Sequence, residues 1–259
     1  MTAQSPTILV FDSGLGGLTV FREIVPLRPD AHFVYAADDA GFPYGRLSER
    51  ELSDRVVSVM GRLIETHRPD LVVIACNTAS TLVLTELRKQ FTVPFIGTVP
   101  AIKPACAASQ TRLVSVLGTE ATVTREYTKK LIQDFGQGCD VTLVGSRRLA
   151  VLAEALLRGE AVDDADIADE IMPCFVERDG LRTDTVVLAC THYPLLDGHL
   201  ARLTPWPVTF VDPAPAIARR VLDLLGPAVP ASTKVGAQFV FTSGERPTPA
   251  LETVFSRFG

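Results

Sequence analysis

Strand-like apolar runs alternate with helix-compatible stretches along most of the chain. Four runs come early, at 7–11, 32–37, 71–75 and 93–97. The pattern then restarts, with further runs at 113–118, 140–145, 185–189, 208–212 and 238–244. Continuous apolar strands are typical of parallel sheets, because helices cover both faces of such sheets. We therefore expect an α/β fold with mostly parallel sheets flanked by helices.

The stretches between these runs carry helical periodicity. We expect helices at 18–27, 47–67, 77–90, 119–135, 148–159 and 215–225. The fourth of these is predicted as a single helix opened by Thr119, and the fifth ends at Gly159.

The chain also repeats itself. Residues 72–80 read VVIACNTAS and residues 186–194 read VVLACTHYP, so each apolar run ends in Ala-Cys. An earlier pair of segments, ILVFDSG and SVLGTEA, also matches. We interpret these matches as a weak internal duplication, which predicts two pseudo-symmetric α/β lobes. We place the first lobe at 1–98 and 207–259 and the second lobe at 99–206.

The composition argues against several classes of protein. The net charge of −5 does not favour nucleic-acid binding. No apolar run approaches the roughly 20 residues that a membrane helix needs, and the first residues do not resemble a signal peptide. The five cysteines form no C-x-x-C pair, which argues against a disulfide framework or a structural metal site. We expect a cytoplasmic protein.

Small polar side chains follow several of the predicted strands. They are Asp12 and Ser13, Asp38, Cys76 to Thr78, Thr119, and Cys190 to His192. Open parallel sheets bind ligands beyond the carboxyl ends of their strands. Asn77, Thr78 and Thr191 are helix-capping residue types, and helix N-termini favour anions. We therefore expect a small anionic ligand, held between the lobes.

Cys76 and Cys190 are the strongest candidates for chemistry. A single buried cysteine at a strand end is commonly a small packing residue, but two in matched contexts favour a function. If the lobes face each other, the two thiols approach one molecule from opposite sides, as inversion of a stereocentre requires. A cysteine pKa near 8.5 is readily moved toward neutrality, so a thiol and a thiolate can exchange a proton with a carbon acid. Asp12 and His192 are candidate supporting groups.

A dinucleotide site is an alternative that the residues leave open. Gly14 and Gly16 follow a strand and open a helix, and Asp38 follows a second strand. This resembles the fingerprint in which an acid binds the ribose, although Thr19 replaces the third glycine. The fingerprint does not explain the matched cysteines.

A metal site built from Cys76, Cys190 and His192 is a second alternative, which the local spacing does not favour. The other three cysteines lack a matched context, and we assign them to packing or to the surface: Cys106, Cys139 and Cys174.

Several blocks spread over nearly the whole chain resemble the cofactor-independent aspartate/glutamate racemase family, and within it the glutamate racemases. They are FDSGLGGLTV (11–20), PYG (43–45), ACNTAS (75–80), VPAIKPA (99–105), GTEATV (118–123), LAEALLRGE (152–160) and ACTHYPLL (189–196).

This resemblance implies two lobes with the active site between them and racemisation of L-glutamate to D-glutamate for peptidoglycan synthesis. It implies Cys76 and Cys190 as the proton donor and acceptor, supported by Asp12, Glu154 and His192. The substrate contacts that it implies are Asp12, Ser13, Tyr44, Gly45, Asn77, Thr78, Thr119, Thr191 and His192. No cofactor and no metal are expected, and the expected partner is the small-molecule substrate, with no nucleic acid or membrane. A homodimer is compatible with the resemblance.

Overall fold

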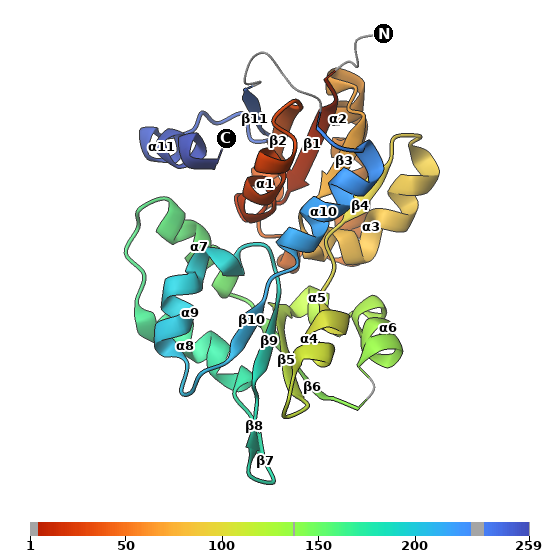
Figure 1. Cartoon of the computed structure of the whole chain (residues 1–259). Helices are drawn as coiled ribbons and strands as arrows, with labels where there is room; N and C mark the ends of the chain where they lie inside the picture. Colours follow the sequence, from red (N-terminus) through yellow and green to blue (C-terminus); the bar gives the residue numbers. More distant parts are fainter. Residues whose placement is uncertain (1–4, 137, 229–235, 259) are drawn as a thin grey trace. The chain divides into compact units, whose positions relative to one another are not determined.

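The computed structural model describes residues 5–136, 138–228 and 236–258. The chain divides into two compact units, one drawn from 1–98 and 214–259 and the other from 99–213. Each unit contains one parallel sheet flanked by helices (Figure 1). The predicted α/β fold class is therefore confirmed.

The first unit is built on a five-stranded parallel sheet. Its strands, in spatial order, are β11 (Ala237–Phe241), β2 (His32–Ala37), β1 (Thr7–Asp12), β3 (Leu71–Ile74) and β4 (Phe95–Gly97). All four residues of β3 are buried, and so are the last five of β1 and of β2. This continuous burial is the physical reason why these strands read as apolar runs and not as alternating ones.

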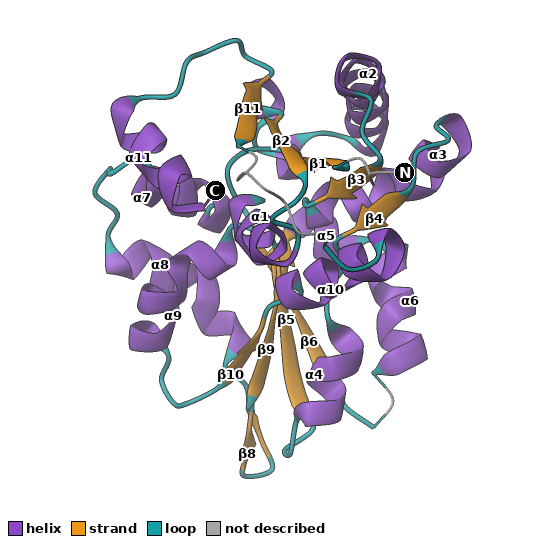
Figure 2. Ribbon diagram, turned by 45° about the horizontal axis from the view of Figure 1, so that its top comes forward, coloured by secondary structure: helices purple, strands orange, loops and turns teal. Residues whose placement is uncertain are grey.

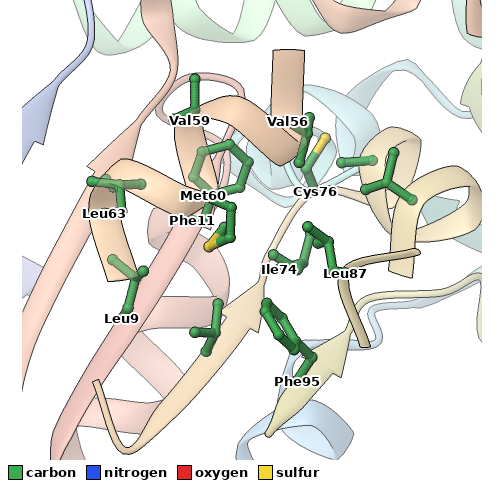
Figure 3. Packing of buried hydrophobic residues seen from close by; sticks show 14 of the residues in the cluster. Leu9, Phe11, Val56, Val59, Met60, Leu63, Ile74, Cys76, Leu87 and Phe95 are labelled. Carbon is green, nitrogen blue, oxygen red and sulfur yellow. The ribbon is translucent and has the colours of Figure 1, made fainter. Parts of the chain in front are cut away.

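Helices cover both faces of this sheet. Side chains of α2 (Glu49–His67) and α3 (Asn77–Gln90) pack on the face that carries Leu9 and Phe11 (Figure 3). The remaining helices of the unit are α1 (Leu18–Ile24), α10 (Ala214–Leu225) and α11 (Pro249–Phe258). Phe21 of α1 contacts the opposite face through edge-on ring contacts with Phe33 and Tyr35, and α1 packs against α10.

The second unit is built on a four-stranded parallel sheet, whose strands lie side by side in Figure 2. Their order is β10 (Thr209–Val211), β9 (Thr185–Ala189), β5 (Leu113–Thr119) and β6 (Asp140–Ser146). The helices of this unit are α4 (Ile102–Ala108), α5 (Glu120–Thr124), α6 (Glu126–Phe135), α7 (Leu149–Leu157), α8 (Asp164–Ile171) and α9 (Asp197–Leu203). A short antiparallel hairpin, β7 (Glu177–Arg178) and β8 (Leu181–Arg182), completes it.

The second boundary between the units differs from the predicted one. The sequence placed it between residues 206 and 207, whereas the compact units divide between Pro213 and Ala214. The reason is that β10 pairs with β9, so it belongs to the second sheet. The last strand, β11, pairs with β2 and completes the first sheet.

The single helix predicted at 119–135 is wrong. Two helices, α5 and α6, occupy this stretch, and Arg125 between them is extended, with φ −70° and ψ 144°. The run Thr122, Val123, Thr124 is β-branched and has low helix propensity. In addition, the Thr128 hydroxyl donates to the Thr122 carbonyl at 2.6 Å and so stabilises the break.

No helix among the described residues combines the length and the apolar character that crossing a membrane requires.

Candidate active site

Both units carry a cysteine just beyond a strand, at the point where the strand order reverses. In the first unit β1 has β2 on one side and β3 on the other, and Cys76 follows the end of β3. In the second unit β5 has β6 on one side and β9 on the other, and Cys190 follows β9 directly. Open α/β sheets bind ligands beyond the carboxyl ends of the strands at such reversals. The two thiols thus occupy equivalent places in their own sheets.

Cys76 lies beside the turn that follows β1. It is the N-cap residue of α3 and is 5% exposed. Phe11 pairs with Ile74 in the parallel register, which brings the end of β1 next to this cysteine. The Cys76 thiol donates to the Ser13 hydroxyl at 3.7 Å. Asp12 is fully buried, and one of its carboxylate oxygens accepts from the Gly14 N–H at 3.0 Å.

Tyr44 opens a 3₁₀ helix (Tyr44–Arg46) and points its phenol into the protein. The phenol donates to the Asp38 carboxylate. Burial raises the pKa of Tyr44 well above its ordinary value, and the nearby charges of Asp38 and Cys76 raise it further. Tyr44 is therefore a neutral phenol, whereas Gly45 beside it is exposed.

Asp38 cannot serve as the acid of a dinucleotide site. Its side chain is fully buried, and it accepts two hydrogen bonds from Arg55, at 2.6 and 2.7 Å. It also accepts one from Thr242 at 2.6 Å and one from Tyr44. A carboxylate has about four lone-pair positions, so none is left for a ribose. Close packing gives a different reason for a glycine in this turn. A Cβ on Gly17 would lie 2.7 Å from the Cβ of Asp12, so this position has no room for a side chain.

Asn77 is a helix-capping residue type, but it does not occupy the capping position of α3. Cys76 takes the N-cap position, and Asn77 lies in the first turn of α3. The side-chain nitrogen and oxygen of Asn77 are both buried without a hydrogen-bond partner. A buried polar group left unsatisfied costs about 1–3 kcal/mol. Asn77 is thus a group that a polar ligand would satisfy, next to Cys76 and the buried Thr78.

Cys190 is backed by an acid–base chain within the second unit. Its sulfur lies 3.7 Å from Nδ1 of His192, and Nε2 of the same ring lies 2.9 Å from Glu154. The other oxygen of Glu154 accepts from Arg158 at 3.0 Å. Cys190, His192 and Glu154 are all at least 94% buried, while the Arg158 side chain is 48% exposed. This row of side chains can therefore hold a proton next to the sulfur of Cys190. It runs from that sulfur through His192 and Glu154 to the partly exposed guanidinium of Arg158.

Thr119 and Thr191 flank Cys190. Gly118 pairs with Ala189 in the parallel register, so the following residue, Thr119, lies beside the cysteine turn. Thr119 caps α5 by accepting from the Thr122 N–H at 3.2 Å. Thr191 is buried, but no α-helix starts there; a 3₁₀ helix (Tyr193–Leu196) follows. Cys76 and Cys190 therefore differ in the helix that comes after them.

The other cysteines lie outside these turns. Burial raises the pKa of Cys174 to about 12. Burial, together with the neighbouring Cys139, raises the pKa of Cys106 to about 12. Thiols held in the neutral form in this way fit the predicted packing role.

Metal ligands are not clustered in the described parts of the chain. No group of three or more His, Cys, Asp or Glu side chains there could hold a metal ion. The metal hypothesis therefore gains no support from the arrangement of donors.

Two arginines that pair with acids described above were not identified from the sequence: Arg158 pairs with Glu154, and Arg55 pairs with Asp38. Arg158 lies four positions after Glu154 on one helix face, a spacing that could have predicted the pair. Arg55 could not have been found in this way, because it lies 17 positions from Asp38 and on a different element.

The chain matches known proteins over nearly its whole length. The sequence profile of the Asp/Glu/Hydantoin racemase family matches residues 17–221. A glutamate racemase of Brucella anthropi is 59% identical over 226 residues, which cover 87% of this chain and 81% of that protein. A glutamate racemase of Brucella canis is 53% identical over 260 residues, covering 99% and 94%. The crystal structure of Escherichia coli glutamate racemase, in complex with L-glutamate and the activator UDP-MurNAc-ala, has a TM-score of 0.87 and 41% identity, covering 98% and 96%.

The chain belongs to the Asp/Glu/Hydantoin racemase family. It is an amino-acid racemase, and thus an isomerase. Its resemblance to the glutamate racemases is confirmed.

Proposed function

We propose that this racemase interconverts L- and D-glutamate by two-base proton transfer at Cα, with Cys76 and Cys190 as the two bases and without a cofactor. The observation that carries the proposal is the equivalent placement of the two thiols at the strand-order reversals of their sheets. The names of the Brucella and Escherichia coli relatives support glutamate as the substrate.

The proposed reaction balances its protons over one turnover. One cysteine, as thiolate, takes the hydrogen of Cα as a proton, so the C–H bond breaks and an S–H bond forms. The electron pair stays on the carbanion. The other cysteine, as thiol, delivers its proton to the opposite face and becomes a thiolate. The product is the mirror-image amino acid, and the reverse direction starts from the exchanged protonation state.

Different neighbours would support the two thiols. His192, oriented by Glu154, can hold or release a proton next to Cys190. The Ser13 hydroxyl and the adjacent carboxylate of Asp12 take the corresponding place near Cys76. Positioned acid–base groups of this kind typically contribute about 10²–10⁴-fold to a rate.

The substrate would be held by polar groups that lie beyond the carboxyl ends of the strands. Asn77 has both polar side-chain atoms unpaired and buried, so it can give and accept hydrogen bonds to an amino acid. The other contacts that we propose, each located above, are Asp12, Ser13, Tyr44, Gly45, Thr78, Thr119, Thr191 and His192.

We further propose that the D-glutamate serves peptidoglycan synthesis. The activator in the Escherichia coli complex, UDP-MurNAc-ala, supports this role. A homodimer stays a prediction, which sedimentation of the purified protein would test.

Racemisation in heavy water tests the two-base mechanism. Because the returned proton comes from a thiol that exchanges with solvent, the first product formed from either enantiomer should carry deuterium at Cα. The unreacted substrate should stay unlabelled at early times. A single base that served both faces would carry protium into the product. Substrate choice is tested separately, by comparing glutamate with aspartate without added cofactor; faster turnover of aspartate would reject glutamate as the substrate.

A further inference from the structure

A buried polar cluster lies beside the Tyr44–Gly45 turn and has no place in the proton transfer. We call it the Asp38 cluster, and its members are Asp38, Tyr44, Arg55 and Thr242. Asp38 follows β2, Arg55 lies on α2, and Thr242 follows β11. Side chains from three separate elements, one of them about 200 positions away in the sequence, therefore meet on one carboxylate.

Each carboxylate oxygen of Asp38 accepts two hydrogen bonds within the cluster. Oδ2 of Asp38 accepts from Nε of Arg55 and from the Tyr44 phenol, and Oδ1 accepts from Nη2 of Arg55 and from Thr242. The only O–H of Tyr44 is thus committed to Asp38. Arg55 provides the only cation among these partners, and a buried carboxylate that lost its cation would be strongly destabilised.

The loop next to the cluster is shaped around the Arg55 side chain. Gly41 lies against the guanidinium, and a Cβ at this position would clash with Nε of Arg55. On the other side, the N–H and hydroxyl of Ser243 donate to Asp39 at 2.9 and 2.5 Å. The segment from Asp39 to Tyr44 is therefore fixed at both ends.

Tyr44 connects this cluster to the candidate site. Its ring belongs to the same packed cluster as Cys76 and Val56 of α2. Figure 3 labels Cys76 and Val56 among the residues of this packed cluster. A displacement of the ring would therefore move the Tyr44–Gly45 turn, which is one of the proposed substrate contacts.

We infer that Arg55 is a positioning residue for substrate binding, because it holds Asp38, which in turn fixes Tyr44 and the exposed turn at Gly45. The inference rests on the proposed function through these two contacts. A contact that the substrate keeps equally in the ground state and the transition state affects KM more than kcat.

The test compares Arg55→Gln, Arg55→Lys and Gly41→Ala in the full chain. Arg62→Gln is the matched control, because Arg62 also lies on α2, is exposed, and donates a hydrogen bond to Ser58 on the same helix. We expect Arg55→Gln to raise the KM for both enantiomers about tenfold, with kcat changed less than about threefold. Arg55→Lys should have a smaller effect, since lysine keeps the charge without the paired geometry.

Gly41→Ala should raise KM as well, because it displaces Arg55 while both charges stay in place. If Arg55→Gln fails to fold, Arg55→Lys and Gly41→Ala carry the test. Melting temperatures are measured for every variant, since a purely structural role would lower stability and the active fraction without changing KM.

A double variant shows whether Arg55 acts through Tyr44. If it does, adding Arg55→Gln to Tyr44→Phe should change KM less than about twofold further. Additive effects, or a KM that stays at the wild-type value in the Arg55 and Gly41 variants, would overturn the inference. The turnover of glutamate by the wild type tests the proposed function separately; if aspartate were the substrate, the same ratios would be measured with aspartate.

Discussion

Cys76 and Cys190 occupy equivalent positions but have different neighbours. A serine hydroxyl contacts the first thiol, and a histidine–glutamate pair backs the second. An imidazole can take up and release a proton near neutral pH, whereas a hydroxyl cannot. The two half-reactions would therefore be assisted by different chemistry.

Replacement of either thiol should abolish racemisation. We expect Cys76→Ala and Cys190→Ala each to lower kcat by at least about 10³-fold, because the proton must leave one face and return on the other. The measurement is turnover from each enantiomer, with circular dichroism to show an intact fold. Cys106→Ala is the control and should keep near-normal turnover. A Cys190→Ala protein that remained active would contradict the two-thiol mechanism.

Glu154→Gln tests the acid–base chain behind Cys190. The amide keeps the shape but removes the charge that faces His192, so we expect kcat to fall about ten- to hundredfold with little change in KM. Glu160→Gln is the control, since Glu160 is exposed and lies just beyond the same helix. An equal loss of kcat in both variants would show that the effect does not come from the contact between Glu154 and His192.

The candidate site could be predicted in part from the sequence. The cysteines and their polar neighbours follow apolar runs, and a strand end is a local property of the chain. The orientation of Asn77 and the contact between Arg55 and Asp38 could not be predicted, because they depend on how separate elements pack.

At the scale of elements, Asp184 ties the start of β9 to the loop before β5. It accepts from the Ser109 hydroxyl at 2.6 Å and from the backbone N–H groups of Gln110 and Thr111 at 2.7 and 2.9 Å. Partial burial by itself raises the pKa of Asp184, but these bonds outweigh it, so the pKa lies below its ordinary value. Folding therefore favours the ionised carboxylate.

The stability that Asp184 provides should depend on pH. A carboxyl pKa lowered by folding contributes stability above its unfolded value, near 3.9, and this stability is lost as the pH falls through the lower folded-state pKa. We expect Asp184→Asn to melt below the wild type at pH 7, with the difference shrinking below about pH 4. Asp134→Asn, at an exposed position of α6, is the control. A difference that did not depend on pH would assign the effect of Asp184 to shape alone.

At the scale of the whole molecule, the two units differ in how the chain builds them. The second unit is one continuous segment, 99–213, with its own sheet and core. The first unit needs both 1–98 and 214–259, because β11 completes its sheet and α10 packs against α1.

We therefore expect the fragment 99–213 to fold alone and to unfold cooperatively, since it is large enough to form a core of its own. The fragment 1–98 should not, because it lacks β11 and α10. Far-ultraviolet circular dichroism and thermal unfolding of both fragments would check this. Cooperative unfolding of 1–98, or a disordered 99–213, would contradict the expectation.

The sequence by itself determined the strands of the two parallel sheets and the places of the two thiols. Apolar runs and helical periods report local backbone geometry and which side chains are buried, and these are set by neighbouring residues. The tertiary structure alone decided that β10 joins the second sheet, that β11 closes the first, and that Arg55 faces Asp38. Such contacts join residues far apart in the chain. They depend on which arrangement buries the most apolar surface and pairs the buried charges, and no local pattern encodes this.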